Sequence, residues 1–137
     1  MEDRARALTL DTSFIVALFN RKDPMHEAVR STVLARTGPL LIPCGILAEI
    51  SYLLERRFPS ALASFLDDLA SGAFILHHDA DDLVRASELV RRYDDLGLGL
   101  SDALVITCAE RHGGLAGTLD RRHFDVVARE GTFVVVP

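Results

Sequence analysis

The stretch Ala7-Leu8-Thr9-Leu10-Asp11-Thr12-Ser13 carries the clearest information about the fold. Its first four residues form a short, mostly apolar run that lacks the polar alternation of a half-exposed strand. Such a run is typical of a strand buried on both faces. An acidic residue follows this strand, and Thr12 and Ser13 are both good helix N-caps. The stretch therefore predicts a buried strand, an acid at its carboxyl end and a helix over residues 14–19.

The same alternation of short apolar segments and helices continues along the chain. Further strands are expected at residues 40–42, 73–76, 115–119 and 132–136, and helices over residues 23–36, 44–57, 59–72, 79–93 and 101–112. Short apolar strands interleaved with helices are typical of a parallel sheet with both faces covered. The predicted fold class is α/β, with a central parallel sheet of about five strands flanked by helices on both faces.

Composition indicates one compact domain. The chain has 137 residues, of which 49% are hydrophobic and 26% charged, so it can build a core and is not disordered. The charged residues 1–6 are expected to form a loose tail, with the domain over residues 7–137. Apolar runs fall short of the roughly 18 residues that a membrane span needs, and the N-terminus lacks the apolar stretch of a secretory signal. A cytoplasmic location is therefore expected.

Charge and cysteine content exclude several functions. Acidic residues outnumber Lys and Arg by 20 to 15, which disfavours a protein that holds nucleic acid by broad phosphate neutralisation. Cys44 and Cys108 lie among apolar residues without a CxxC spacing, so we predict two buried free thiols and neither a disulfide nor a zinc site. His77 and His78 have no metal-binding spacing and are interpreted as loop residues.

Four acidic residues occupy positions that suit a metal site. Asp11 and Asp120 follow the first and fourth predicted strands, and parallel sheets bind ligands at the carboxyl ends of their strands. Glu49 and Asp102 lie early in apolar helices, beside the buried stripe. Carboxylates at the edge of a core are costly without a partner, and few basic residues lie nearby in sequence. Mg²⁺ or Mn²⁺ suits ligation by carboxylates alone.

Each acid also has an ordinary structural interpretation. Asp11 is explained equally well as an N-cap, and Asp120 as part of a turn. Glu49 suits a helix surface, and Asp102 favours the positive end of a helix dipole. Spacing alone does not show that the four side chains converge.

Four strings occur in order along the chain: Leu10-Asp11-Thr12-Ser13-Phe14-Ile15, Ala48-Glu49-Ile50-Ser51-Tyr52-Leu53, Leu98-Gly99-Leu100-Ser101-Asp102-Ala103 and Thr118-Leu119-Asp120-Arg121-Arg122-His123-Phe124. Together they resemble the PIN-domain nucleases, and most of all the VapC-type toxins of bacterial toxin–antitoxin pairs. The resemblance spans residues 8–137. Asp11, Glu49, Asp102 and Asp120 match the family's acidic quartet, and Thr118 matches a small hydroxyl residue that supports the site, where it would hold Asp11 or a water.

The resemblance implies a single PIN-like domain that cleaves RNA with Mg²⁺ or Mn²⁺, forms a homodimer and is neutralised by a small antitoxin covering the site. One or two ions held by the quartet would lower the pKa of a water and hold the scissile phosphate, giving 5′-phosphate and 3′-hydroxyl products. Ser13 is expected to support the quartet. Arg121 and His123 are expected near the site or on flanking phosphates, and a solvated turn explains these two residues equally well.

Other functions occur with a similar fold, and each differs from a nuclease toxin in a specific feature. A phosphoacceptor domain needs a lysine late in the chain, whereas the only lysine is Lys22. The intact quartet opposes a catalytically silent α/β binding module. A stand-alone PIN nuclease of RNA processing, without an antitoxin, has the same sequence pattern. It differs from a toxin in whether the adjacent reading frame encodes a small DNA-binding protein.

Overall fold

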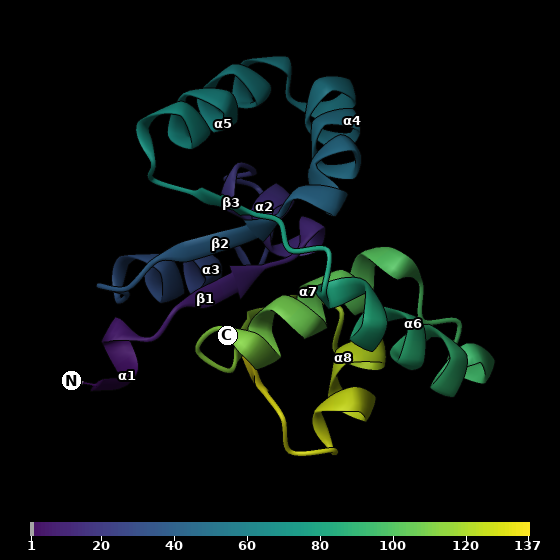
Figure 1. Ribbon diagram of the computed structural model, residues 1–137. Helices are drawn as coiled ribbons and strands as arrows, with labels where there is room; N and C mark the ends of the chain where they lie inside the picture. The colour runs from purple at the N-terminus through teal and green to yellow at the C-terminus, as the bar shows by residue number, and fades with distance from the viewer. Residues whose placement is uncertain (1) are drawn as a thin grey trace.

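The computed structural model describes residues 2–137, and a five-stranded parallel sheet forms its centre (Figure 1). The strands are β1 (Leu8–Leu10), β2 (Leu40–Pro43), β3 (Ile75–His77), β4 (Leu115–Gly117) and β5 (Val134–Val136). They are arranged in the order β3-β2-β1-β4-β5, and every neighbouring pair is parallel. The predicted α/β class and the parallel five-stranded sheet are confirmed.

Helices connect the strands and cover both faces of the sheet. They are α1 (Glu2–Ala5), α2 (Thr12–Leu18), α3 (His26–Leu34), α4 (Leu47–Arg57), α5 (Pro59–Ser71), α6 (Asp82–Arg92), α7 (Leu100–Arg111) and α8 (Arg121–Ala128), with 3₁₀ turns η1 (Cys44–Ile46) and η2 (Asp94–Leu96). Helix α7 contacts β1, β2 and β4, and α6 packs on α7. Figure 1 shows α2 and α3 on the opposite face of the sheet from α7, and the α4–α5 hairpin extending beyond the sheet. Within residues 2–137, none of the helices is both long and apolar enough to cross a bilayer.

The core surrounds the central strand and the helix in front of it. All three residues of β1 are buried, as expected for a strand with neighbours on both sides and helices on both faces. Helix α7 is enclosed between the sheet and α6, so its buried residues, Ala103, Val105, Ile106, Thr107, Cys108 and Ala109, surround most of the helix. Edge strand β3 leaves Ile75 and Leu76 exposed.

The chain changes direction across the sheet between β1 and β4. It runs from β1 outward through β2 to β3, and then crosses back to β4 and β5. The connections after β1 and β4 therefore leave the sheet toward opposite faces, and a crevice forms between them at the carboxyl ends of these strands. Asp11 directly follows β1, and Asp120 lies three residues beyond β4. The topology thus places both acids beside the crevice.

Two helices begin at residues other than those predicted. Asp11 is the N-cap of α2, because its carboxylate accepts a hydrogen bond from the backbone N–H three residues along, whereas Thr12 and Ser13 already belong to the helix. Gly99 is the N-cap of α7, and Ser101 lies within its first turn. Both helices therefore begin earlier in the sequence than predicted.

Two other helices begin later than predicted. Asp23 and Asp79 each accept a hydrogen bond from the backbone N–H two residues along, which closes a turn before the helix. Helix α3 consequently begins at His26 and α6 at Asp82, and α3 ends at Leu34, before the predicted residue 36. The helix predicted over residues 44–57 begins as η1 before it continues as α4.

The N-terminal segment is not the loose tail that its charge predicted. Residues 2–5 form α1, and Arg6 donates from Nε to the carbonyl oxygen of Gly113 at 2.6 Å. Arg6 and Arg36 both pair with Asp3, so the charged residues are used in contacts with the domain. Gly113 adopts a φ of +88°, and a Cβ there would meet the backbone of Ala7.

Two further predictions need correction. Helix α8 was not predicted, because the polar run Asp120-Arg121-Arg122 was interpreted as a turn, although Phe124 and Val127 behind it have helical spacing and are buried. Cys44 is exposed at the start of η1, although an apolar sequence surrounds it. Cys108 is buried as predicted, and its sulfur accepts a hydrogen bond from Thr9 Oγ1 at 3.3 Å.

Candidate active site

A cleft of about 370 Å³ opens at the carboxyl ends of β1 and β4, and all four acids of the predicted quartet line it. Asp11 follows β1, and Asp120 caps α8. Glu49 and Asp102 lie in the first turns of α4 and α7. Helices that connect parallel strands start at the carboxyl edge of the sheet, so their first turns face the same crevice as the strand ends. The topology therefore brings together four acids that are far apart in sequence.

Asp11 is the most deeply buried of the four, with 6% of its surface exposed. Its Oδ1 accepts hydrogen bonds from Ser13 Oγ at 2.7 Å and from the backbone N–H of Phe14 at 2.9 Å, and its Oδ2 accepts one from Thr118 Oγ1. Burial raises the pKa of Asp11 above its usual value, although these hydrogen bonds oppose the rise. The carboxylate is thus fixed in orientation, since both oxygens have donors.

Two hydroxyl groups connect the start of α2, directly after β1, to the loop after β4. Ser13 Oγ, which donates to Asp11, also accepts a hydrogen bond from the backbone N–H of Leu119 at 3.0 Å. Thr118 Oγ1, the other donor to Asp11, accepts one from the backbone N–H of Asp120 at 2.9 Å. Ser13 and Thr118 therefore both hold Asp11, and through them the positions of Asp11 and Asp120 depend on each other.

Asp102 shows that the four carboxylates interact electrostatically. Burial, followed by the negative charges of Asp120 and Asp11, raises the pKa of Asp102 to about 6. Glu49 contributes in the same direction, and His123 opposes the rise. A carboxyl group with this pKa is partly protonated near neutral pH, because burial and then repulsion by its neighbours disfavour the ionised form.

Asp120 and His123 form a pair at the start of α8. His123 Nδ1 lies 2.8 Å from Asp120 Oδ2 and 3.7 Å from Asp102 Oδ2, and its Nε2 lies 3.2 Å from the carbonyl oxygen of Leu96. The hydrogen bond with Asp120 is the main cause that raises the pKa of His123. His123 is therefore turned toward the acids, whereas Arg121 is exposed, pairs with Asp125 at 3.3 Å and does not line the cleft.

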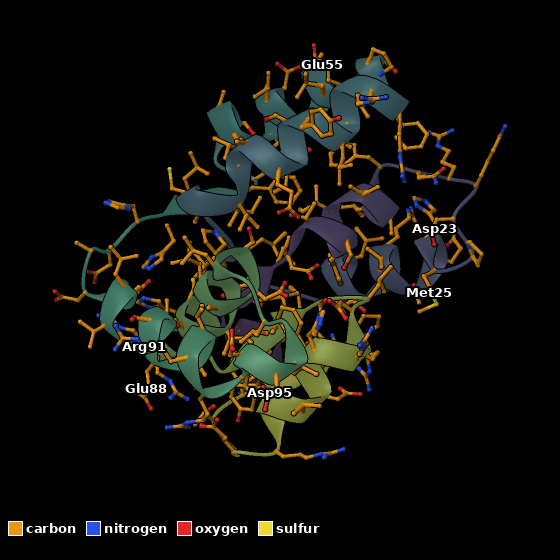
Figure 2. The ribbon with its side chains drawn as sticks, turned by 90° about the vertical axis from the view of Figure 1, so that its right-hand side faces the viewer. Asp23, Met25, Glu55, Glu88, Arg91 and Asp95 are labelled. Carbon is orange, nitrogen blue, oxygen red and sulfur yellow. The ribbon has the colours of Figure 1, made fainter. Side chains whose placement is uncertain are left out.

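Glu49 and His77 differ from their expected places or roles. Glu49 is exposed, although the sequence placed it at the edge of a buried stripe, because the α4–α5 hairpin extends beyond the sheet. Asp95 lies on the exposed turn η2 and does not line the cleft (Figure 2). His77 does not remain a free loop residue, since its Nε2 lies 3.0 Å from the carboxylate of Asp82.

Two charged residues of the cleft were missed by the sequence analysis. Asp23, labelled in Figure 2, reaches the cleft from the loop between α2 and α3. Of the described residues that line the cleft, Arg57 alone is basic, and it lies at the end of α4. Glu49, Leu53 and Arg57 follow one another at intervals of four, so the helical period was the signal that could have found Arg57.

The donor set fits a hard divalent cation. Asp102, Asp120 and His123 each offer a ligand atom, and these atoms lie within 4.8 Å of one another. Asp11 lines the same cleft. A cation there would offset both the burial and the mutual repulsion that raise the pKa of Asp102, because it attracts every carboxylate.

Asp102→Asn is expected to stabilise the protein in EDTA at pH 7.5. Its native pKa of about 6 exceeds the roughly 3.9 of an unfolded Asp. The native state therefore binds more protons, and stability falls as the pH rises from about 4 through 6. The uncharged amide removes this cost, which we estimate at roughly 1–2 kcal/mol above pH 6 and near zero at pH 4. Thermal melts at both pH values measure the difference.

The same melts with Mg²⁺ or Mn²⁺ test whether Asp102 binds metal. Metal should raise the Tm of the wild-type chain by mass action and raise that of the variant much less. Asp95→Asn, on the exposed turn η2, is the matched control and should behave as the wild-type chain. An Asp102→Asn variant that is destabilised and still responds fully to metal would place Asp102 outside a metal site.

Comparison with known proteins agrees with this fold. Residues 8–130 match the family model described as PIN domain. The chain is 32% identical over 135 residues to Ribonuclease VapC26 of Mycobacterium tuberculosis. This alignment covers 95% of this chain and the whole of that protein.

Solved structures with a similar fold include VapC20 of Mycobacterium tuberculosis, described as a sarcin–ricin loop cleaving toxin. Its TM-score is 0.75 at 22% identity, over 87% of this chain and 94% of that chain. VapBC2 of Rickettsia felis, bound to a promoter DNA fragment, gives a TM-score of 0.68 at 20% identity, over 94% and 96% of the two chains. DNA-bound VapBC of Salmonella typhimurium gives 0.66 at 16% identity, over 95% and 96%. The chain therefore belongs to the PIN-domain family and, within it, to the VapC type.

Proposed function

We propose that the chain is a metal-dependent endoribonuclease and the toxin of a type II toxin–antitoxin pair. The observation that carries this proposal is the convergence of Asp11, Glu49, Asp102 and Asp120 on one cleft at the carboxyl edge of the sheet. Similarity to Ribonuclease VapC26 supports RNA as the substrate. Similarity to two VapBC structures supports a toxin role over that of a stand-alone RNA-processing nuclease.

The proposed cofactor is Mg²⁺ or Mn²⁺, held by the acidic quartet. When bound, such an ion lowers the pKa of water and stabilises negative charge on a phosphodiester. Asp11 contributes a carboxylate that cannot rotate, because Ser13 and Thr118 hold it. The Glu49 side chain has no hydrogen bond or ion pair among the described residues, so its carboxylate would be available as a ligand on the α4 side of the cleft.

Metal dependence is the first test of this proposal. The purified chain should cleave RNA in Mg²⁺ or Mn²⁺, leave 5′-phosphate ends and lose activity in EDTA. Asp120→Asn should reduce the rate on the order of a hundredfold or more, the usual loss when one electrostatic stabiliser of a transition state is removed. Asp67→Asn, an exposed acid on α5, is the control and should cleave normally. Full cleavage in EDTA would indicate a metal-free ribonuclease.

Arg57 is proposed to bind a substrate phosphate beside the scissile one. It lines the cleft on the side of α4 and forms no ion pair within residues 2–137, so its guanidinium is available. Its neighbour Arg56 provides a contrast, because Arg56 donates to Tyr52 Oη at 2.8 Å and its guanidinium lies 5.4 Å from the centre of the Tyr52 ring. Two adjacent arginines thus differ in whether they face the cleft.

The two arginines make a matched pair for kinetics. Arg57→Ala should raise the KM for RNA about tenfold, the size expected for one lost hydrogen bond to a charged group, with kcat nearly unchanged. The salt dependence of KM should also become shallower, because one phosphate contact is gone. Arg56→Ala should change neither quantity. Equal effects of the two substitutions would show that Arg57 acts through general charge and makes no specific contact.

The antitoxin is proposed to cover the cleft with a peptide that carries an arginine. Apolar side chains of Val16, Ile46, Leu53 and Val105 line the cleft beside the acids, so the surface suits a peptide with apolar residues next to a cation. A bidentate arginine is the protein group that best replaces a divalent ion among carboxylates.

Co-expression tests this partner directly. The small protein encoded next to the chain should co-purify with it and suppress RNA cleavage. Replacement of the inserted arginine by alanine should restore cleavage. Unchanged RNA cleavage in the presence of the intact small protein would remove the toxin assignment and leave the nuclease assignment standing.

We also propose that the chain acts as a homodimer in the cytoplasm, as the family resemblance implies. Tyr52 on α4 and Leu66 on α5 are 56% and 48% exposed, and these apolar side chains suit contact with a second copy. A light-scattering mass of one chain, 15.0 kDa, would contradict the dimer.

A further inference from the structure

His123 presents both of its ring nitrogens to groups that accept hydrogen bonds. Nδ1 faces the carboxylates of Asp120, at 2.8 Å, and Asp102, at 3.7 Å. Nε2 lies 3.2 Å from the carbonyl oxygen of Leu96. Both of these groups only accept, so without a cation the ring satisfies both of them by carrying a hydrogen on each nitrogen.

The carbonyl of Leu96 determines which nitrogen a cation can reach. It only accepts, so Nε2 keeps its hydrogen and donates to it, and Nδ1, which faces the two carboxylates, is the nitrogen that a cation beside them can bind in place of its hydrogen. Metal-ligating histidines have the same arrangement, in which the nitrogen remote from the metal donates to a carbonyl or carboxylate and thereby orients the ring. The surroundings of His123 therefore suit a cation between Nδ1 and the two acids.

We propose that Nδ1 of His123 is a direct ligand of the divalent ion, together with the carboxylates of Asp102 and Asp120. The three ligand atoms already lie within 4.8 Å of one another. Two ligands at right angles on an ion such as Mg²⁺, each roughly 2.1 Å from it, are about 3 Å apart, so small side-chain shifts suffice. This inference rests on the proposed metal-dependent function and adds a nitrogen donor to its carboxylate set.

A nitrogen ligand changes which ion the site prefers. Mg²⁺ takes oxygen ligands, whereas imidazole is a good ligand for transition-metal ions. We therefore expect a site of two carboxylates and one imidazole to bind Mn²⁺ more tightly than Mg²⁺. The ratio of the two affinities should be larger than at a site made of carboxylates alone. The position of His123 supports this role, since Asp120 and His123 are three residues apart at the start of α8 and share one side of the helix.

Electron spin echo spectroscopy of Mn²⁺ bound to the purified full-length chain tests the inference without an activity assay. The wild-type chain should show ¹⁴N coupling from a coordinated imidazole. His123→Asn keeps an amide N–H that can donate to Asp120 but cannot act as a nitrogen ligand. This variant should lose the coupling and bind Mn²⁺ at least roughly tenfold more weakly, with a change of less than about threefold for Mg²⁺. His78→Asn removes an exposed imidazole outside the cleft and should retain the coupling.

The outcomes separate this inference from the proposed function. Mn²⁺ that binds the wild-type chain without ¹⁴N coupling, and fails to bind Asp102→Asn, would show a carboxylate site in which His123 only holds Asp120. An unchanged Mn²⁺ affinity in His123→Asn would overturn the inference in the same way. If Mn²⁺ does not bind the wild-type chain at all, the metal-dependent function itself fails.

Discussion

The buried carboxylate of Asp11 is the interaction on which the site depends. Burial of a charge is costly, and here donors from two separate loops offset that cost. Ser13 and Phe14 come from the segment after β1, and Thr118 comes from the segment after β4. Because Thr118 also accepts from the backbone N–H of Asp120, the hydrogen bonds that stabilise Asp11 also determine where α8 begins.

The acids of the cleft repel one another. On the opposite side of the domain, ion pairs hold α6, α7 and the segment after α8 together. Arg85 of α6 makes two hydrogen bonds of 3.0 Å to Glu110 of α7 and one of 2.9 Å to Glu130, just after α8. Although burial opposes it, hydrogen bonds from Tyr93, Arg85 and Arg92 lower the pKa of Glu130 to about 2. Glu88, labelled on the outer face of α6 in Figure 2, also pairs with Arg85.

This ion-pair network has a consequence for the cleft. It connects α6, α7 and the segment after α8, and α7 and α8 are the helices whose starts carry Asp102 and Asp120. The acids at the starts of α7 and α8 repel one another, and the ion-pair network holds these two helices in place at their other ends. Such a division is expected of functional sites, where local interactions are unfavourable and the scaffold compensates.

The sequence predicted the sheet, and drew attention to individual acids, for physical reasons that are local. Buried parallel strands are short and apolar, and an acid directly after such a strand stands out, as Asp11 does. The convergence of Asp102 and Glu49 with Asp11 depends on the strand order, which no local pattern contains. Only the resemblance to a known family predicted it.

The remaining errors also have local causes. Helix α8 was missed because its polar start was interpreted as a turn, although Phe124 and Val127 have helical spacing, and the inward orientation of His123 was missed with it. Cys44 appeared buried because its neighbours are apolar, yet it lies at the exposed start of η1. Burial at such a position depends on which elements pack nearby, and sequence composition does not report that.

The central claim is that distant acids form one metal centre at the crevice between β1 and β4. Anomalous diffraction from a crystal of the chain soaked in Mn²⁺ tests it most directly. We expect a strong anomalous peak among the carboxylates of Asp11, Asp102 and Asp120. A peak elsewhere on the surface, with none in the cleft, would contradict the claim.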